Sequence, residues 1–402
     1  MLTHSNYEED PRVRREAEAI VASGRPVDVY ALRQPGALGR EVIDGVRLRR
    51  LPVQRHQGAG LAIYLGEYLA FLGLAGAAVT AAHPRRRYAL LQVHTLPDFL
   101  AFGGLPLKIA GVPLLLDLHE AMPEFFRSRF AGRFGPLGVR LLGWQERASI
   151  AVAGHAVTVN EALRDRLVGL GIRPDKVSVV PNAPSLARFD PARSRHRTFA
   201  EDGVVRLVYA GALSPIYELD VAFAALALLG DLRPELDMTL DLYGRDFNEV
   251  PLAALARDLG VAGRVRFHDR IAIDRVPAAL AEADIGIAPT RRSRFTDFSL
   301  STKLFEYAAM EKPVVASRLP LVERVFGEVV TSYAPGDPRD LARAILRVVD
   351  EPLEREVRVA RGRTCVAELA WERESERYIA LVERLAVDGR ARPERTTPGG
   401  AP

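Results

Sequence analysis

The stretch SLSTKLFEYAAMEKPVVAS, residues 299–317, holds the pattern that decides the fold of this chain. It reads as a loop, a helix that begins at Ser301 or Thr302, a Lys-Pro turn and a short buried strand. Apolar strands that alternate with helices are typical of parallel sheets covered by helices on both faces. The unusual feature is the polar start of this helix, because Lys303 and Glu306 stand three residues apart and share one face.

The same alternation runs through the rest of the chain. The clearest strand patterns are at 27–32, 89–94, 113–119 and 156–160 in the first half, and at 205–211, 238–244, 265–269 and 284–289 in the second. At 402 residues the chain is too long for one ordinary core. The pattern therefore predicts an α/β protein with two doubly wound Rossmann-like domains. We expect them to face each other across a cleft, with ligands at the carboxyl ends of the strands.

Composition shifts give the expected domain boundaries. We expect an N-terminal domain over 1–190, a polar, arginine-rich linker over 191–204 and a C-terminal domain over 205–364. A last helix over 365–386 is expected to pack back on the N-terminal domain. The Pro/Gly-rich tail, 387–402, is expected to be disordered.

Bulk properties narrow the class of protein. A net charge of +4 is small for this length, and no dense basic stripe or stacking platform points to nucleic acid. The single cysteine, Cys365, fits a reducing compartment. The start of the chain is too polar for a signal peptide. The apolar stretch 61–82 contains Glu67, which favours a buried helix over a membrane span. We expect a cytoplasmic protein, with peripheral contact to the cytoplasmic face of a membrane left open.

The start of the quoted helix suits an anionic ligand. A helix N-terminus offers spare N–H donors and a partial positive charge, which favour a phosphate. Lys303, one of only four lysines, stands in the first turn, where a cation is unfavourable unless an anion binds. Glu306 accepts hydrogen bonds, and the paired hydroxyls of a ribose are natural donors. The combination suits a nucleoside diphosphate, although an exposed Lys303–Glu306 pair would explain both residues without a ligand.

The segment 265–325 resembles the donor-binding half of family 4 glycosyltransferases, which have the GT-B fold. It is most similar to a branch common in bacterial polysaccharide assembly, whose helix reads TKLFEYMA. The segments YEEDPRVRREAEAIVASG (7–24) and VPLLLDLHEAMPEFF (112–126) resemble the same branch. The resemblance spans roughly 1–385. It implies a retaining transfer of a sugar from a nucleoside-diphosphate sugar to a saccharide or lipid-linked acceptor, in the synthesis of cell-surface polysaccharide or glycoconjugate.

The resemblance assigns roles to the residues of the quoted helix. Glu306 matches the glutamate that holds the ribose, and the backbone amides of Ser301 and Thr302 match those that hold the diphosphate. A second glutamate of the family, which contacts the donor sugar, is replaced by Phe298. Asp297 is adjacent to that position and is a candidate substitute.

A second departure lies after the strand 205–211. The family's Gly-Arg turn keeps its glycine as Gly211, but Ala212 and Tyr217 stand where an arginine and a lysine grip the diphosphate. Lys303 is our candidate for the missing positive charge and a catalytic role, and Arg245 is a further donor-binding candidate. Arg291, Arg292 and Arg294 are other candidates, although a solvated arginine face explains them too.

Three residues of the first domain complete the predicted site. His119 follows a buried strand, and the resemblance places it beside the donor sugar in a catalytic position; a cap for the next helix is the alternative. Glu120 either orients substrate or serves the start of that helix. His94 also ends a strand and is a weaker candidate for the acceptor.

We expect no metal and no cofactor. No Asp-x-Asp motif lies where a metal–diphosphate bridge is needed. Retention by double displacement needs two carboxylates about 5 Å apart, and no such pair is evident. The resemblance implies a same-face route instead, in which backbone amides and Lys303 stabilise the leaving diphosphate.

The segment 122–144 indicates contact with an inner-membrane surface. It interleaves aromatic with basic residues: Phe125, Phe126, Phe130 and Phe134 with Arg127, Arg129 and Arg133. Such mixtures suit an anionic membrane, although a loop and helix packed on the sheet would explain them as well. The expected partners are thus a nucleotide-sugar donor and a saccharide or lipid-linked acceptor, without nucleic acid.

Two other functions fit parts of the pattern. A sugar-nucleotide epimerase shares the GT-B architecture, and fold does not fix chemistry. A non-catalytic nucleotide-sugar-binding partner would explain the changes at Phe298, Ala212 and Tyr217. Activity without an acceptor would favour the first, and binding without transfer would favour the second.

Overall fold

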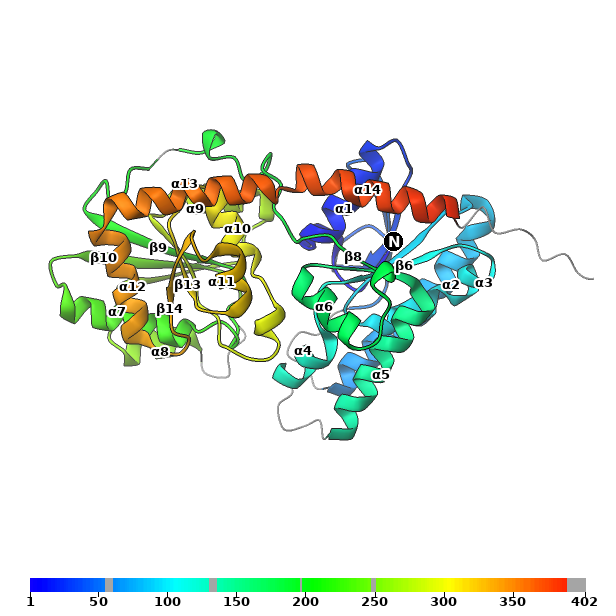
Figure 1. Cartoon of the computed structure of the whole chain (residues 1–402), viewed down its shortest axis with the longest axis horizontal. Helices are drawn as coiled ribbons and strands as arrows, with labels where there is room; N and C mark the ends of the chain where they lie inside the picture. The colour runs from blue at the N-terminus through cyan, green and yellow to red at the C-terminus, as the bar shows by residue number, and fades with distance from the viewer. Residues whose placement is uncertain (55–60, 130–135, 196, 247–250, 389–402) are drawn as a thin grey trace, which may run out of the picture. The chain divides into compact units, whose positions relative to one another are not determined.

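The computed structural model describes residues 1–54, 61–129, 136–195, 197–246 and 251–388. The chain divides into two compact units. Unit 1 consists of residues 1–181 and 375–402, and unit 2 consists of residues 182–374. Each unit is built around its own predominantly parallel sheet (Figure 1), as the alternation of strands and helices predicts.

Unit 1 has an eight-stranded sheet in the order β3-β4-β2-β1-β5-β6-β7-β8, parallel except for the β3–β4 pair. The strands are β1 (Leu2–Thr3), β2 (Asp28–Leu32), β3 (Arg40–Ile43), β4 (Val46–Leu51), β5 (Leu91–His94), β6 (Leu114–Leu118), β7 (Gly154–Thr158) and β8 (Val177–Val179). The helices are α1 (Pro11–Ala22), α2 (Leu61–Arg86), α3 (Leu105–Ile109), α4 (Met122–Arg129), α5 (Pro136–Ala153), α6 (Glu161–Gly169) and α14 (Trp371–Asp388), which unit 1 includes from Ser375 onward.

The centre of this sheet is its most apolar part. Strand β6 reads LLLDL and is buried along its whole length, as expected of a strand covered on both faces. Strand β1 pairs with β2 on one side and β5 on the other, so the chain reverses its direction of winding there. Ligands of doubly wound sheets bind at such reversals, at the carboxyl ends of the strands. His94 ends β5 there, and His119 follows β6.

Unit 2 has a six-stranded parallel sheet in the order β11-β10-β9-β12-β13-β14. The strands are β9 (Val204–Ala210), β10 (Asp237–Tyr243), β11 (Val265–His268), β12 (Ile285–Ala288), β13 (Val314–Ser317) and β14 (Val330–Tyr333). The helices are α7 (Leu219–Leu232), α8 (Leu252–Asp258), α9 (Val276–Ala281), α10 (Thr302–Ala309), α11 (Pro320–Phe326), α12 (Pro338–Asp350) and α13 (Pro352–Glu368).

Alternate residues of β9 point into two different cores. Leu207 and Tyr209 pack in the cluster that contains α7 and α12, whereas Val208 and Ala210 pack in the cluster of α10. This is the two-residue period of a strand with helices on both faces. The winding reverses between β9 and β12, so the carboxyl end of β9 is the expected ligand position.

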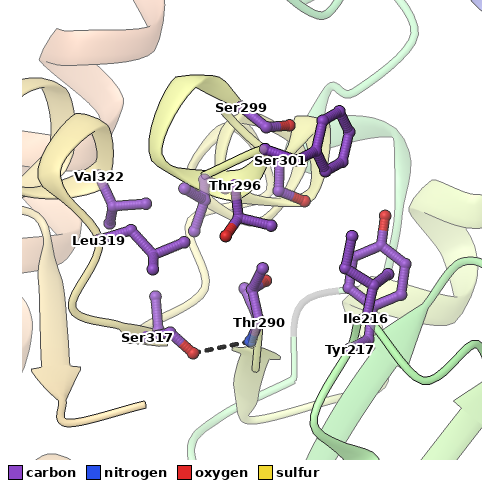
Figure 2. Close-up of a pocket in the computed structure, with 13 residues that line it drawn as sticks. Ile216, Tyr217, Thr290, Thr296, Ser299, Ser301, Ser317, Leu319 and Val322 are labelled. Carbon is purple, nitrogen blue, oxygen red and sulfur yellow. Dashed lines mark hydrogen bonds between the residues drawn. The ribbon is translucent and has the colours of Figure 1, made fainter. Parts of the chain in front are cut away.

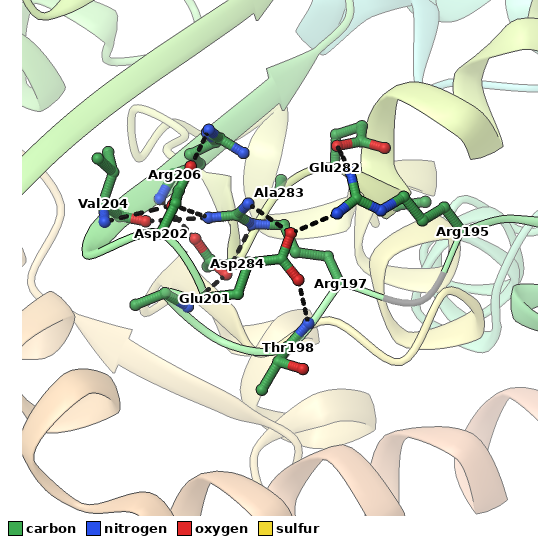
Figure 3. Close-up of polar contacts among 12 residues, drawn as sticks. Arg195, Arg197, Thr198, Glu201, Asp202, Val204, Arg206, Glu282, Ala283 and Asp284 are labelled. Carbon is green, nitrogen blue, oxygen red and sulfur yellow. Dashed lines mark hydrogen bonds and ion pairs between the residues drawn. The ribbon is translucent and has the colours of Figure 1, made fainter.

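The segment 191–204, predicted as a linker, instead lies within unit 2. Arg197 is buried and pairs with Asp202 at 2.6 Å and with Asp284 at 3.3 Å (Figure 3). Asp284 also accepts hydrogen bonds from the backbone of Ala200 and Arg206. These contacts fasten the segment at the start of β9, and the unit boundary lies earlier in the chain, between residues 181 and 182.

Two predicted helices differ in detail. The single helix expected over 365–386 is split between α13 and α14. The helix is interrupted at residues 369–370, and the N–H of Trp371 bonds to the carbonyl of Pro184. Helix α2 has one buried face, with Phe71 and Val79 in the core of unit 1. Its other face exposes apolar side chains, and by length and composition α2 is able to cross a membrane.

Candidate functional site

The candidate donor site is built around the start of α10, at the carboxyl edge of the unit 2 sheet. Ser301 is the N-cap residue, and its side chain makes no capping hydrogen bond. The cap side chain therefore satisfies none of the first-turn N–H groups, although the N–H of Leu304 donates to the Ser301 carbonyl at 3.2 Å. Glu306 lies one turn later, and a side-chain hydrogen bond from Thr302 lowers its pKa. The helix start thus offers backbone donors beside an anchored carboxylate.

Lys303 is buried and Glu306 is half-buried, and the two charges act on each other. Lys303 is only 6% exposed, and burial lowers its pKa to about 8, against the opposing effect of the Glu306 charge. Burial likewise raises the pKa of Glu306, while Lys303 and Thr302 lower it. An exposed surface ion pair, the alternative interpretation of these residues, is therefore wrong for Lys303. A buried ammonium needs a compensating partner, and a bound phosphate would supply one.

The Lys303 ammonium lies over two tyrosine rings. Its Nζ is 4.2 Å from the ring centre of Tyr217 and 4.7 Å from that of Tyr209. Within the described part of the chain, Nζ donates no hydrogen bond to a protein acceptor. Gly211 borders the same position, because a Cβ atom there would meet Lys303 Cε at 2.5 Å. Gly211, Lys303 and Glu306, predicted from distant parts of the sequence, are thus brought together.

Arg245 lies on the neighbouring loop. The N–H of Gly211 bonds to the carbonyl of Tyr243, and the N–H of Leu213 bonds to the carbonyl of Arg245. The loops after β9 and β10 are thereby held side by side. The Arg245 side chain is exposed and forms no ion pair within the described residues. It stays a candidate for the edge of the site.

A pocket that is partly open to solvent adjoins the α10 start on another side (Figure 2). It is lined by side chains that are mostly hydroxyl-bearing or apolar: Ile216, Tyr217, Ala288, Thr290, Phe295, Thr296, Ser299, Ser301, Leu304, Ala316, Ser317, Leu319 and Val322. Neither Lys303 nor Glu306 lines it. Of the predicted donor-binding residues only Ser301 does so, and Tyr217 borders both this pocket and the Lys303 ammonium.

The arginines before α10 pair with neighbouring carboxylates. Arg291 contacts Asp220 at 3.1 Å, and Arg292 contacts Asp297 at 3.2 Å. These are exposed pairs of small energetic value, so the solvated face is the better description of Arg291 and Arg292. Asp297 lies in a short 3-10 helix with its carboxylate engaged by Arg292. A contact between Asp297 and a sugar would have to compete with that pair.

In unit 1, Asp117 holds both predicted histidines. Its Oδ2 lies 3.0 Å from His94 Nδ1 and 3.1 Å from His119 Nε2. The backbone N–H of His119 also donates to Thr95 Oγ1 at 3.1 Å. His119 keeps 18% of its side chain exposed, whereas His94 is fully buried. The predicted contact of His94 with an acceptor is therefore not supported, and His94 contacts His119 both through Asp117 and directly, with 3.4 Å between His94 Nδ1 and His119 Nε2.

Asp117 is itself fixed by Arg12 of α1. Arg12 Nε lies 2.8 Å from Oδ2 and Nη2 lies 2.7 Å from Oδ1. Arg12 also pairs with Glu16 at 3.1 Å, and Glu16 accepts a hydrogen bond from Gln92. This buried network extends to Tyr378 of α14, whose hydroxyl donates to Gln92. Glu120 follows His119 as a half-buried residue in the turn before α4.

His94, Asp117 and His119 are also the one group of described residues with spacing suitable for a metal ion. Their donor atoms lie 3.0–3.4 Å apart. However, Asp117 Oδ2 already accepts a hydrogen bond from Arg12, and hydrogen bonds from the two imidazoles account for the spacing. The Arg12 charge opposes a further cation at this carboxylate. The chemistry of the donor set therefore fits a hydrogen-bonded cluster better than a metal centre.

The structure adds residues that the sequence analysis missed. Asp117 lies in β6, two residues before His119, and the two-residue period of an extended chain puts both side chains on one face. That local signal was sufficient to find it. Arg12 carries no local signal, because it reaches Asp117 across 105 residues. Tyr209 and Tyr217 appeared in the sequence only as an ordinary strand residue and as a departure from the family pattern.

Comparison with known families agrees with this architecture. The Glycosyl transferase 4-like domain matches residues 10–183, and the Glycosyl transferases group 1 domain matches residues 205–351. The two matches together span most of the chain. The chain therefore belongs to the glycosyltransferases that combine these two domains. The narrower branch suggested by the TKLFEY helix is not resolved by these matches.

Individual relatives are more distant. The D-inositol 3-phosphate glycosyltransferase of Thermomonospora curvata is 27% identical over 91% of this chain and 88% of its own length. The MMP alpha-(1->4)-mannosyltransferase of Mycolicibacterium hassiacum is 25% identical over 71% of this chain and 68% of its own. Both are similar along most of their length.

Solved structures share the fold at low identity. Sucrose-phosphate synthase from Thermosynechococcus elongatus superposes with a TM-score of 0.78 at 18% identity, over 96% of this chain and 99% of its own. Anabaena Alr3699/HepE in complex with UDP-glucose has a TM-score of 0.69 at 15% identity, over 95% and 98%. The predicted GT-B fold is thereby confirmed.

Proposed function

We propose that this glycosyltransferase is a retaining hexosyltransferase that moves a sugar from a nucleoside-diphosphate sugar to a saccharide or lipid-linked acceptor. The observation that carries the proposal is the pair at the start of α10. Lys303 is a buried cation whose three N–H donors have no protein acceptor in the described residues, and Glu306 is an anchored carboxylate one turn away. The first suits a diphosphate, and the second suits a ribose.

The reaction breaks one bond and forms another on the same face of the sugar. The bond between the anomeric carbon and the diphosphate oxygen breaks, and the diphosphate leaves with the electron pair. The acceptor hydroxyl oxygen bonds to the anomeric carbon, and its proton passes to the departing diphosphate. Lys303 and the first N–H groups of α10 stabilise the charge that develops on that diphosphate. We assign no step to a metal or cofactor, and the role of His119 beside the sugar rests on the family resemblance.

The comparisons support the donor class. The Anabaena structure of the same fold holds UDP-glucose, and the Mycolicibacterium relative is named a mannosyltransferase. Both favour a hexose carried by a nucleoside diphosphate. The acceptor is left as a saccharide or lipid-linked saccharide, and we propose a role in cell-surface polysaccharide or glycoconjugate synthesis on the resemblance of the TKLFEY helix.

Thermal unfolding with UDP, GDP, ADP and their hexose conjugates tests the donor site. A ligand present at about 100 times its Kd stabilises the folded protein by about 2.7 kcal/mol. We expect one base to raise the melting temperature of the wild type, and Glu306→Ala to remove most of that rise. Glu356→Gln on α13, an exposed carboxylate outside the site, is the matched control and should keep the full shift.

Incubation with the stabilising hexose conjugate then separates the three functions. Transfer to a saccharide or lipid-linked acceptor, with the anomeric configuration kept, supports the proposal. An altered sugar on the intact nucleotide without any acceptor would identify an epimerase. Binding without any turnover would identify a non-catalytic partner. A melting temperature that no ligand of the panel raises would contradict the donor site itself.

We also propose that unit 1 contacts the cytoplasmic face of an anionic membrane, so that the protein is cytoplasmic and peripheral. The segment 122–144 fits this only in part. Phe126 is buried and Phe125 is half-buried in the cluster with Tyr64 and Tyr68 of α2, so these rings are not free to insert. The other two rings, Phe130 and Phe134, and Arg133 lie outside the described residues, as does the side chain of Arg129.

The exposed face of α5 supports the proposed membrane contact. Leu137, Leu141 and Trp144 are 70%, 58% and 68% exposed, and Arg140 and Arg147 are exposed along the same face. This spacing puts all five on one side of the helix. Trp and apolar residues mixed with arginines suit the interface of an anionic bilayer.

Co-sedimentation with vesicles checks the membrane contact. Binding to vesicles with anionic lipid, and little to purely zwitterionic ones, is expected. Trp144→Ser and Arg140→Glu should each weaken it, whereas Leu353→Ser on α13, which changes an equally exposed apolar residue of unit 2, should not. Equal binding to both kinds of vesicle, or no binding at all, counts against the contact.

A further inference from the structure

The Lys303 ammonium lies in an aromatic enclosure formed by Tyr209 and Tyr217, and it donates no hydrogen bond to a protein acceptor among the described residues. Tyr209 and Tyr217 have ring centres 5.7 Å apart and planes tilted by 58°, and the Lys303 ammonium lies against both rings. A cation is attracted to the face of an aromatic ring within about 6 Å of its centre. Both rings meet this condition. The ammonium is therefore held by π faces, which leave its N–H donors for a ligand.

Of the two rings of the enclosure, one is fixed in the core and the other borders the pocket. Tyr209 is fully buried on β9, and its hydroxyl donates to the carbonyl of Ala212 at 2.8 Å, which fixes the ring. Tyr217 is half-buried and lies on one side of the hydroxyl-rich pocket, with Leu319 and Val322 on the other side (Figure 2). Tyr217 is thus the member of the enclosure within reach of a ligand.

The Lys303 ammonium needs a contact that fixes its position, because the side chain of a lysine is flexible. Among the residues that the structure describes, Glu306 is the charged group that raises the pKa of Lys303. Coulombic attraction alone does not fix direction, and a four-carbon stem has many rotamers. Gly211 leaves room for the stem but supplies no contact that would hold it. The two rings supply that contact.

We propose that Tyr217, backed by Tyr209, is a positioning residue that holds the Lys303 ammonium beside Gly211, ready to receive the diphosphate of the donor. This inference rests on the proposed function for its ligand, but the enclosure itself is testable without one. Tyr217 also stands where the resemblance expects a lysine. The positive charge is therefore delivered by α10, and the loop after β9 contributes the ring that holds it.

The first test needs no nucleotide. The chain has only four lysines, so protein labelled with ¹³C at lysine Cε gives four resolvable side-chain signals, and Lys303→Met assigns the one of interest. A signal over two rings is displaced by their ring currents. Tyr217→Leu should remove much of this displacement and Tyr217→Phe should keep it. A Lys303 signal at an ordinary position in the wild type, or one unmoved in Tyr217→Leu, overturns the enclosure whether or not the protein is a transferase.

The second test links the enclosure to the diphosphate. Nucleoside diphosphates and the matching nucleosides are titrated calorimetrically into wild type, Tyr217→Leu, Lys303→Met and the double variant. We expect Tyr217→Leu to weaken diphosphate binding about tenfold and to leave nucleoside binding nearly unchanged. The double variant should bind the diphosphate only slightly more weakly than Lys303→Met does, because the two residues act as one unit. Tyr217→Phe should recover most of the lost affinity.

The outcomes separate the two proposals. The positioning role of Tyr217 is overturned if the losses of binding free energy add up in the double variant, or if Tyr217→Leu weakens nucleoside and diphosphate binding equally. Either result leaves the donor site intact. No binding of any nucleotide to a wild type whose Lys303 signal is displaced overturns the proposed function and the receiving role with it, while the enclosure stands. Lys176→Met in unit 1 controls for the loss of a lysine charge and should match the wild type.

Discussion

Arg12 and Asp117 are 105 residues apart in the chain and meet through two parallel contacts, 2.8 Å from Nε to Oδ2 and 2.7 Å from Nη2 to Oδ1. Both side chains are buried. The same carboxylate lies against His94 and His119, so one ion pair fixes both histidines. His119, the catalytic candidate of unit 1, is thus oriented through Asp117 by a residue of α1.

Breaking this pair is expected to destabilise unit 1. Removing one partner of a buried ion pair leaves the other uncompensated and lowers the free energy of unfolding by about 3–5 kcal/mol. We expect Asp117→Asn and Arg12→Met each to show such a loss in urea denaturation. Arg14→Met, two residues further along α1, removes partly exposed pairs with Glu18 and Asp44 and should change the free energy by at most about 1 kcal/mol per pair.

The double variant Arg12→Met/Asp117→Asn provides the critical comparison. Because both charges are then absent, its loss should be smaller than the sum of the single losses. Strictly additive effects, or a single-variant loss no larger than that of Arg14→Met, would show that the pair does not stabilise unit 1.

The ionisation of His119 should depend on Asp117. Burial lowers the pKa of His119, but the charge and hydrogen bond of Asp117 raise it, and the net pKa lies above the ordinary 6.5. The folded state therefore gains stability from this histidine below pH 6.5, and the gain is lost as the pH rises through the folded pKa. We expect a His119 titration midpoint above 6.5 in the wild type and a lower one in Asp117→Asn, measured by NMR of the imidazole C–H.

His155 serves as the internal reference for this titration. Burial lowers its pKa to about 4, and its hydrogen bond is to Ser178, not to the Asp117 cluster. Its midpoint should not move in Asp117→Asn. A His119 midpoint that stays in place in that variant would mean that Asp117 does not set its charge.

The sequence predicted the parts of the molecule that depend on local pattern. The period-two and helical alternation found both sheets, and the quoted stretch found α10 with Lys303 and Glu306 on one face. The neighbours of these residues were not predictable in the same way. Tyr209 and Lys303 are 94 residues apart in the sequence (303 − 209), and Arg12 and Asp117 are 105 residues apart. Local periodicity does not predict contacts at such a separation.

The linker prediction failed for a related reason. The segment 191–204 is rich in arginine and polar residues, and composition alone indicates solvent exposure. Arg197 is nevertheless buried, because Asp202, five residues later, and Asp284, 87 residues later, both pair with it. A charged residue can be placed in a core only when its partner is known, and a single sequence does not provide that partner.

The affinity of the donor site for diphosphates should fall at alkaline pH. Burial lowers the pKa of Lys303 to about 8, so the free protein loses this positive charge as the pH rises through that value. Binding of an anion requires the protonated form, and each pH unit above the pKa should weaken binding by up to about tenfold. Calorimetric titration of the preferred nucleoside diphosphate between pH 7 and pH 9.5 measures this.

Lys303→Met is the decisive comparison for the pH profile. Its affinity should be lower at pH 7 and should vary little toward pH 9.5, since the titrating group is gone. Lys176→Met should keep the wild-type profile. An alkaline fall that persists in Lys303→Met would assign the titration to another group.

Gly211 is expected to be intolerant of a side chain. Its φ is +150°, and a Cβ atom would meet Lys303 Cε at 2.5 Å and Nζ at 2.7 Å. Gly211→Ala therefore combines backbone strain with a displaced ammonium. We expect a loss of about 1–3 kcal/mol in the free energy of unfolding, together with a loss of diphosphate affinity comparable to that of Lys303→Met, measured by urea denaturation and calorimetry.

Two further variants separate the causes. Gly263→Ala, also in unit 2, adds a Cβ where nothing lies within 4 Å and should be nearly neutral in both measurements. Gly211→Ala/Lys303→Ala removes the clash but keeps the strained φ, so it should regain only part of the stability and none of the affinity. If Gly211→Ala behaved like Gly263→Ala, the lysine stem would not cross the glycine in solution, and the ammonium would have to reach the diphosphate by another path.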